Sequence, residues 1–139
     1  NMRFLDGDET DNVSKEKIKK KKGYFDRFVV GGFCSNTPIK MINGNNENIE
    51  EICVDDILAD NNKVLGIVIL EPFNIYEYKI NNLSLFASLN IFSFNNDLFY
   101  PIKNTKKRRY IYHLITEKRN FTINDIIVHD YDYAIEKYL

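Results

Sequence analysis

Few side chains in this sequence can act as nucleophiles or carry a proton near neutral pH. The thiols belong to Cys34 and Cys53, and the imidazoles belong to His113 and His129. A thiolate attacks carbonyl carbon, and an imidazole gains or loses a proton close to pH 7. No second cysteine or histidine lies at metal-ligand spacing from either thiol, so the sequence predicts neither a metal nor a cofactor.

Each of these groups also has an ordinary structural interpretation. Cys34 would then be a small, half-buried thiol at the start of a strand, and His113 a hydrogen-bonded packing residue within one. Two cysteines in 139 residues cannot form a disulfide scaffold. We therefore expect a reducing compartment, either the cytoplasm or a virion assembled there.

A cluster of cations is the other group able to do chemistry. It lies between Asn104 and Tyr110 and consists of Lys106, Lys107, Arg108 and Arg109. Such a patch could bind phosphate while Tyr100, Tyr110 and Tyr112 stack on bases, or it could be a charged hairpin loop. The 19 basic residues are balanced by 20 acidic ones, a net charge of −1, which disfavours nucleic acid as the partner.

The elements that must position these residues begin after a charged lead, residues 1–30. Asp6, Asp8, Glu9 and Asp11 precede a lysine-rich run from Lys15 to Lys22. This run is either a solvated linker or a nuclear-import or phosphate-binding patch. Since no apolar run approaches the roughly 18 residues of a membrane span, we expect no membrane partner.

Short β-branched and aromatic segments, separated by Asn, Asp and Gly, make up the rest of the chain. Turn signals recur about every 8 to 12 residues, which predicts an all-β body over residues 31–131 and a tail over 132–139. Because both faces of Tyr110–Thr116 are apolar or aromatic, this strand is expected to be central. The predicted strands are Thr37–Ile42, Lys63–Leu70, Ile75–Ile80, Leu83–Ala87, Ile91–Phe94, Phe99–Lys103, Tyr110–Thr116 and Phe121–Val128.

Motifs at both ends of this body occur in a recognisable order. Gly32-Phe33-Cys34-Ser35-Asn36-Thr37 is followed by Ile49-Glu50-Glu51-Ile52, then Asp56-Ile57-Leu58, then Lys63–Val68. This order resembles the opening of a Hint domain, the fold family of Hedgehog proteins and inteins. Tyr110–Glu117 and Ile126–Tyr131 resemble the closing strands of Hint domains in giant-virus proteins.

The resemblance implies a horseshoe-shaped, pseudo-twofold β fold and a self-cleaving reaction. In that family a Cys or Ser attacks the carbonyl just before it, and a Thr-x-x-His step on a middle strand assists. If Thr37 takes the family's Thr position, Gly32 stands where the nucleophile belongs. Alternatively, a turn shortened by two residues makes Cys34 the nucleophile and Phe33–Cys34 the scissile bond.

The other family positions are also altered in this chain. Ser88 stands for the middle-strand Thr, with Leu89 or Asn90 where its His would be. The imidazole would then have to come from His113 or His129. His129-Asp130 is similar to the His-Asn with which inteins finish, but Tyr131 follows in place of an acceptor Cys, Ser or Thr.

These substitutions lead to the functional expectation. The chain is interpreted as a degenerate Hint-like domain with a structural or interaction role. The surplus of Asn, Ile and Lys, typical of AT-rich genomes, suggests a virus-encoded protein. Its partners would be flanking segments of its own polypeptide and proteins of the virion or host cell. The alternatives are active thioester formation at Phe33–Cys34 and a nucleic-acid or acidic-partner binding module that uses basic loops.

Overall fold

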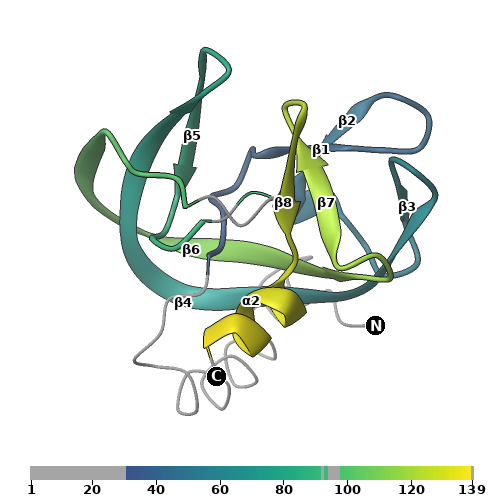
Figure 1. Cartoon of the computed structure of the whole chain (residues 1–139). Coiled ribbons are helices and arrows are strands. Elements are labelled where there is room, and N and C mark those ends of the chain that lie inside the picture. Colours follow the sequence, from purple (N-terminus) through teal and green to yellow (C-terminus); the bar gives the residue numbers. More distant parts are fainter. Residues whose placement is uncertain (1–30, 92, 94–97, 139) are drawn as a thin grey trace.

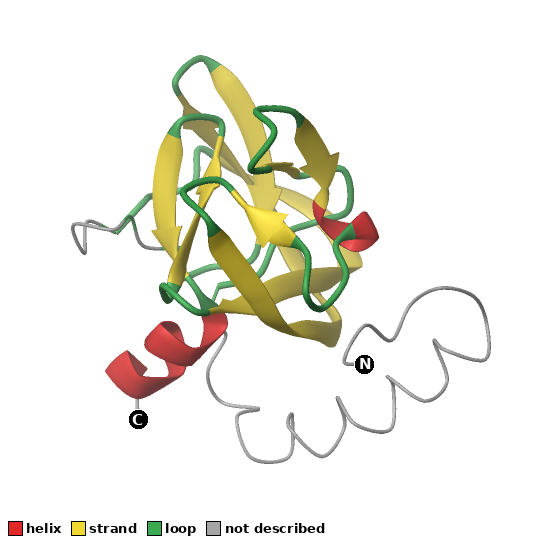
Figure 2. Cartoon of the chain, turned by 90° about the vertical axis from the view of Figure 1, so that its right-hand side faces the viewer, coloured by secondary structure: helices red, strands yellow, loops and turns green. Residues whose placement is uncertain are grey.

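The computed structural model describes residues 31–91, 93 and 98–138. The charged lead, including the lysine-rich run, lies outside the described residues. Strands form most of the body, as Figures 1 and 2 show, so the all-β prediction is confirmed. The elements are β1 (Pro38–Lys40), β2 (Asn46–Asn48), the 3₁₀ helix η1 (Ile49–Glu51), β3 (Ile57–Leu58), β4 (Asn62–Ile80), β5 (Leu83–Ala87), β6 (Lys103–Thr116), β7 (Asn120–Ile123), β8 (Ile126–His129) and α2 (Tyr131–Tyr138).

Strand β4 is the longest element and organises the others around it (Figure 1). The prediction of two strands with a break at Glu71-Pro72 is wrong, because β4 runs through this dipeptide as one strand of 19 residues. Its pairing with β6 shifts register between Leu70 and Phe73, on either side of the proline. Proline has no N–H to donate to a ladder, and a bulge removes the need for one.

A short segment around Phe33 closes the sheet on itself. Tyr76 of β4 pairs with Ala87 of β5 and with Asn104 of β6, so β4 lies between these two strands. Phe33 bridges Ala87 on one side and Tyr112 on the other. Tyr112 therefore has a partner on each edge, but elsewhere β6 pairs with β4 alone, so the prediction that Tyr110–Thr116 is a central strand holds only at Tyr112. The chain enters the body through this seam between β5 and β6.

The segment predicted as one strand over Phe121–Val128 is a hairpin instead. Strands β7 and β8 pair antiparallel, and Asn124 and Asp125 form the turn with φ of 46° and 65°. Two consecutive positive φ angles are typical of the tight turns that suit the twist of a hairpin. The short side chains of Asn and Asp tolerate this conformation better than most residues.

Two other strand predictions are wrong in the described residues. Ile91 is not in a strand, and Ser93 makes only an isolated bridge to Val128. The stretch 99–102 is irregular, since β6 begins at Lys103. Residues 131–138, placed mostly in a tail, form helix α2, whose first residue, Tyr131, is fully buried.

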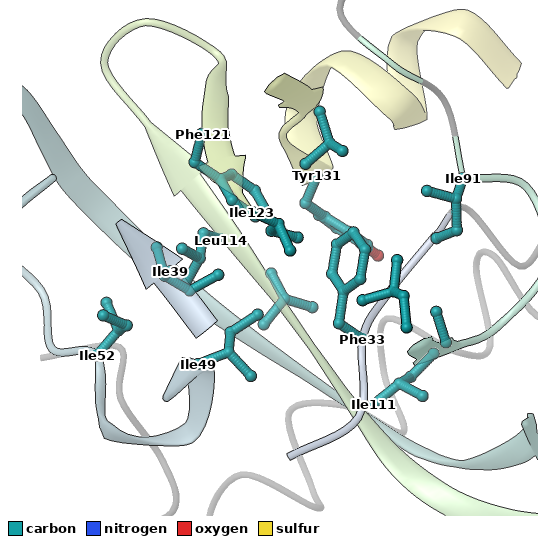
Figure 3. Packing of buried hydrophobic residues seen from close by; sticks show 14 of the residues in the cluster. Phe33, Ile39, Ile49, Ile52, Ile91, Ile111, Leu114, Phe121, Ile123 and Tyr131 are labelled. Atoms are coloured by element: carbon teal, nitrogen blue, oxygen red, sulfur yellow. The ribbon is translucent and has the colours of Figure 1, made fainter. Parts of the chain in front are cut away.

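The hydrophobic core lies between the curved sheet, the β7–β8 hairpin and α2. Figure 3 shows Phe33, Tyr131, Ile91 and Ile111 gathered at one end, with Ile39, Ile49, Leu114 and Phe121 toward the other. All eight side chains are at most 2% exposed. A core of this kind fixes the entry of the chain at Phe33 and its exit toward α2, and these two points frame the candidate site.

Candidate functional site

The peptide between Gly31 and Gly32 lies at the centre of the molecule and is held by a single serine. The Ser88 hydroxyl donates to the Gly31 carbonyl over 2.6 Å, and the Ser88 backbone N–H donates to the Gly32 carbonyl over 3.0 Å. Both glycines have positive φ, 79° and 112°. A hydroxyl in this position would also stabilise negative charge developing on the Gly31 oxygen.

Position 32 has no room for a side chain. A Cβ atom built on Gly32 would lie 2.7 Å from Cδ1 of Ile111 and 3.1 Å from its Cγ1. Ile111 is itself fully buried, so it has little freedom to withdraw. A φ of 112° is also a conformation that side chains of L-residues rarely adopt. Both the backbone and its neighbour therefore require glycine here.

His113 lies directly beside this peptide. A Cβ atom on Gly31 would be 3.0 Å from Nε2 of His113. Nδ1 accepts a hydrogen bond from the Leu114 N–H over 3.0 Å, which assigns the proton of the neutral ring to Nε2. Complete burial lowers the pKa of His113 to about 3, so the ring is neutral at pH 7.

His129 lines the same small cavity as His113. Its ring stacks on Tyr133 of α2 with 3.6 Å between ring centroids. The cavity also contacts Gly31, Asn90 and Ile91, and it has a volume of about 10 Å³. That is space for about one water molecule. The structure thus brings Ser88, His113 and His129 together around Gly31, but leaves no room for a substrate.

The middle-strand step also ends on a packing residue. The Thr-x-x-His spacing, counted from Ser88, ends at Ile91 rather than at the expected Leu89 or Asn90. Ile91 is buried and lines the small cavity that contains His113. An aliphatic side chain has no proton to give. The residue three positions after Ser88 is therefore apolar in this chain.

Cys34 and Thr37 lie away from this centre. They line a different, open groove, and the Thr37 hydroxyl donates to the Cys34 carbonyl over 2.7 Å. Burial raises the pKa of the Cys34 thiol to about 11, although the charge of Arg109 opposes this. The thiol is therefore protonated at pH 7, and neither histidine lines the groove. The structure does not join Cys34 to Ser88, His113 and His129 in one site.

Asp130 is bound to the backbone of two elements. Its carboxylate accepts from the Thr116 N–H and the Tyr133 N–H, each over 2.9 Å, and its side chain is fully buried. The bond to Tyr133 caps the N-terminus of α2, a position that Asp favours. Burial nevertheless raises the pKa of Asp130, against the effect of these two bonds. Both carboxylate oxygens of Asp130 are therefore engaged in hydrogen bonds that hold α2 against β6.

The four cations do not form a hairpin loop, and that interpretation is wrong. Lys106, Lys107, Arg108 and Arg109 all lie within strand β6. Lys107 and Arg109 line the groove of Cys34, whereas Lys106 and Arg108 do not. Tyr110 and Tyr112 are not among the groove-lining residues either. The sequence located the cluster but missed its division between two faces, a division that the alternation of a strand would have indicated.

Other kinds of site receive no support from the described part of the chain. Within residues 31–91, 93 and 98–138, no three His, Cys, Asp or Glu side chains gather as a metal site would require. Among the same residues, no helix has the length and apolarity to cross a bilayer.

Comparisons with known proteins identify the architecture. No protein-family model matches the chain, and no curated protein matches it. Among solved structures, it is similar to a variant of the Ssp DnaB mini-intein, with a TM-score of 0.57 and 17% identity over 72% of this chain and 94% of that one. It is also similar to a DnaB intein from Synechocystis sp. PCC 6803, with a TM-score of 0.55 and 14% identity over 72% of this chain and 98% of that one. These likenesses, together with the seam at Phe33 and the central Gly31–Gly32 peptide, show that the chain has the horseshoe-shaped Hint fold of inteins.

Proposed function

We propose that this chain is a Hint domain of self-cleaving ancestry that no longer cuts itself and serves as a structural or interaction module of a larger polypeptide. One observation carries the proposal: the nucleophile position is Gly32, and Ile111 fills the space that a nucleophilic side chain would need. Without an attacking atom, the Gly31–Gly32 amide has no route to an ester or thioester.

The proton-transfer step is impaired in the same way. Ile91 stands at the family's His position, and His113, the imidazole that does lie beside Gly31, has a pKa of about 3. A general acid is most effective when its pKa lies near the working pH, so a ring this hard to protonate is a poor donor to a leaving nitrogen at pH 7. Two independent requirements of the reaction are therefore unmet.

The C-terminal end of the β body, at Asp130 and Tyr131, supports the same conclusion. Cyclisation at position 130 would need a side-chain nitrogen free to attack the backbone carbonyl of residue 130 itself, which breaks the peptide bond to residue 131. Both oxygens of Asp130 instead accept backbone hydrogen bonds, and the next residue, Tyr131, is buried and begins α2. The surplus of Asn, Ile and Lys supports a source with an AT-rich genome, such as a large DNA virus. The partners would then be flanking segments of its own polypeptide and virion or host proteins.

The first experiment measures cleavage directly. The full chain is incubated with dithiothreitol or hydroxylamine, reagents that cleave a thioester or ester, and its intact mass is followed. We expect no fragment from cleavage at Gly31–Gly32. A fragment ending at Gly31 would contradict the proposal.

A reconstruction tests the ancestry itself. We expect Gly32→Cys alone to destabilise the protein without cleavage. The combination of Gly32→Cys, Ile91→His and Ile111→Ala supplies a nucleophile, an imidazole and space, and should show thiol-induced cleavage before residue 32. The matched control keeps Ile91→His and Ile111→Ala but leaves Gly32 unchanged, and should stay intact. A folded triple variant that never cleaves would argue against a self-cleaving ancestry.

A second candidate, cleavage at Phe33–Cys34, is favoured by one contact. The Phe33 carbonyl accepts from the Tyr112 N–H over 2.8 Å, a donor that could stabilise an oxyanion. The protonated Cys34 thiol and the absence of both histidines from its groove weaken this candidate. Thiol-induced cleavage that is abolished by Cys34→Ala, but not by Cys53→Ala, would establish it in place of the first.

A further inference from the structure

The groove that Cys34 lines is open and has a volume of about 660 Å³. One wall is β5, the other is the start of β6, and Ile75 and Glu77 of β4 form the floor. The segment Cys34–Pro38 closes one end. The groove is thus the continuation of the seam between β5 and β6, beyond the point where Phe33 fills it.

The two walls of the groove are sheet edges. Among the described residues, β5 pairs with β4 along Leu83–Ala87, and the start of β6 pairs with β4 on either side of an irregularity over residues 105–107. On their other edges, Phe33 and Cys34 reach only Ala87, Phe86 and Tyr112. Further along, no recorded strand pairing in the described chain joins the facing edges. Backbone N–H and C=O groups on such edges are a template for an added strand.

The side chains along the groove are arranged by charge. Lys103, Thr105, Lys107 and Arg109 of β6 all line the groove. The opposite wall is apolar: Leu83 and Phe86 of β5 are each 41% exposed. The single floor carboxylate, Glu77, accepts a hydrogen bond from Ser84 over 2.9 Å. An occupant that matches both walls carries acidic groups on one side and apolar groups on the other.

We propose that the groove binds an extended, acidic peptide segment of a partner protein, which adds as a strand between β5 and β6. Alternate side chains of a strand point to opposite sides, so acidic residues at every second position would face Lys103, Lys107 and Arg109. The intervening apolar residues would contact Leu83 and Phe86. Since β5 has five residues, the bound segment spans about five residues.

A peptide suits the groove better than a nucleic acid does. Single-strand binders stack bases on aromatic rings along a basic channel. The tyrosines that flank the cations, Tyr100, Tyr110 and Tyr112, do not line this groove, and Phe86 is its only aromatic lining residue. Glu77 on the floor would also repel a phosphate backbone. The open sheet edges, in contrast, offer hydrogen bonds that only a polypeptide backbone can match in register.

This inference gives the proposed interaction role a partner, but it is tested separately from the loss of self-cleavage. The groove contains neither Gly32 nor the two histidines. A cleavage-active chain could still bind the peptide, and an inactive chain could fail to bind it. The two experiments can therefore fail independently.

The binding experiment uses the full chain and a labelled heptapeptide that alternates Glu with Val. We expect fluorescence anisotropy to report saturable binding that weakens about tenfold between low and about 0.5 M salt, because charge pairs at an open surface are screened. The same peptide with N-methyl groups at alternate backbone nitrogens should bind about tenfold more weakly, since it cannot complete the ladder. Equal binding of the methylated peptide would overturn strand addition.

Charge reversal on the two faces of β6 provides a matched pair of variants. Lys107→Glu with Arg109→Glu removes cations from the groove, and we expect about a tenfold or greater loss of peptide affinity. Lys106→Glu with Arg108→Glu changes the net charge equally on the other face, and should change affinity by about twofold at most. Equal losses would mean that only overall charge matters. Thermal melts check that all variants are folded, and Lys107→Gln with Arg109→Gln replaces the first pair if it is not.

Cys34 offers an independent readout in a Cys53→Ser background. Bound peptide should slow the alkylation of Cys34 by iodoacetamide, and an unaltered rate at saturating peptide would place binding elsewhere. Tighter binding of an oligothymidylate that competes with the peptide would overturn the proposal in favour of nucleic acid. In another outcome, peptide binding appears only after Asp6, Asp8, Glu9 and Asp11 are changed to the amides Asn and Gln. That result would overturn the proposal, because it would mean that the acidic lead of this chain is the segment that occupies the groove.

Discussion

Two hollows in the described part of the chain, the cavity that Gly31 lines and the groove that Cys34 lines, differ in size and in charge. The cavity beside Gly31 has a volume of about 10 Å³ and contains both histidines, whereas the groove beside Cys34 has about 660 Å³ and is lined by three cations. The first is small and its lining surface is mostly apolar, whereas the second is open and carries charged side chains. The two hollows lie on neighbouring segments of the chain, since Gly31 and Phe33 line the cavity and Cys34 lines the groove.

The sharpest way to test this contrast is to add one methyl group at position 32. Gly32→Ala combines a positive-φ penalty with a 2.7 Å contact to Ile111, and we expect a loss of about 4 kcal/mol in the free energy of unfolding. Gly44→Ala is the matched control, because φ there is 87° but nothing lies within 4 Å of an added Cβ atom. It should cost about 1 kcal/mol. Urea denaturation measures both, and equal losses would mean that the centre is not tightly packed.

The pH dependence of stability tests the dryness of the central cavity. The folded-state pKa of His113, about 3, lies below its ordinary value of 6.5. The stabilisation from its neutral ring is therefore complete above pH 6.5 and is lost as the pH falls toward 3. Between pH 6.5 and 4 we expect a loss of about 3 kcal/mol, at 1.36 kcal/mol for each pH unit.

The variant His113→Phe isolates this contribution. Its denaturation midpoint should vary much less over that pH range than that of the parent, even though the Leu114 N–H loses its acceptor. A parent and variant with parallel pH profiles would show that His113 is accessible to protons in the folded state, and the contrast with the groove would weaken.

Asp130→Ala tests whether the hydrogen bonds of the Asp130 carboxylate stabilise the folded protein. The change leaves the buried Thr116 N–H without its acceptor and removes the cap of α2, and we expect a cost of about 2 kcal/mol. Chemical denaturation provides the value. Asp132→Ala, an exposed change in the first turn of the same helix, is the control and should cost about 0.5 kcal/mol. A smaller effect at 130 than at 132 would contradict the capping role.

Substitutions in the groove should change the free energy of unfolding less than substitutions elsewhere in the molecule. Lys107→Glu with Arg109→Glu changes the charge of two exposed side chains, and we expect a stability change of about 0.5 kcal/mol or less. Thermal unfolding checks this value. A larger loss would show that these cations stabilise the fold itself rather than a surface for a ligand.

The sequence predicted the fold class well because its signals are local. Alternation, β-branched residues and Asn-rich turns reflect the needs of individual strands, and Leu83–Ala87 was predicted with the bounds that the structure shows. The errors arose where tertiary contacts override a local signal. Pro72 indicated a break, but pairing with β6 carries β4 through it. Asn124-Asp125 is a turn signal that was overlooked within an apolar run.

The site was less predictable, since chemistry depends on which residues meet across the fold. Counting back from Thr37 reaches Gly32, and the structure places the neighbouring Gly31 against the Ser88 hydroxyl and His113. No pattern in the sequence shows that Ile111 fills the neighbouring space, because these positions are separated by most of the domain. The groove is equally hidden, since its walls come from strands brought together only by closure of the sheet.

The way the chain enters the body also determines how the domain would respond to tension. Phe33 exchanges two hydrogen bonds of 2.8 Å with Tyr112, and the neighbouring residue, Cys34, donates to Phe86 over 2.9 Å. A pull on the polypeptide ahead of Gly31 would act along this short strand and strain its cross-strand bonds together rather than one after another. A domain attached in this manner would transmit mechanical load between its neighbours without first unravelling at its own entrance.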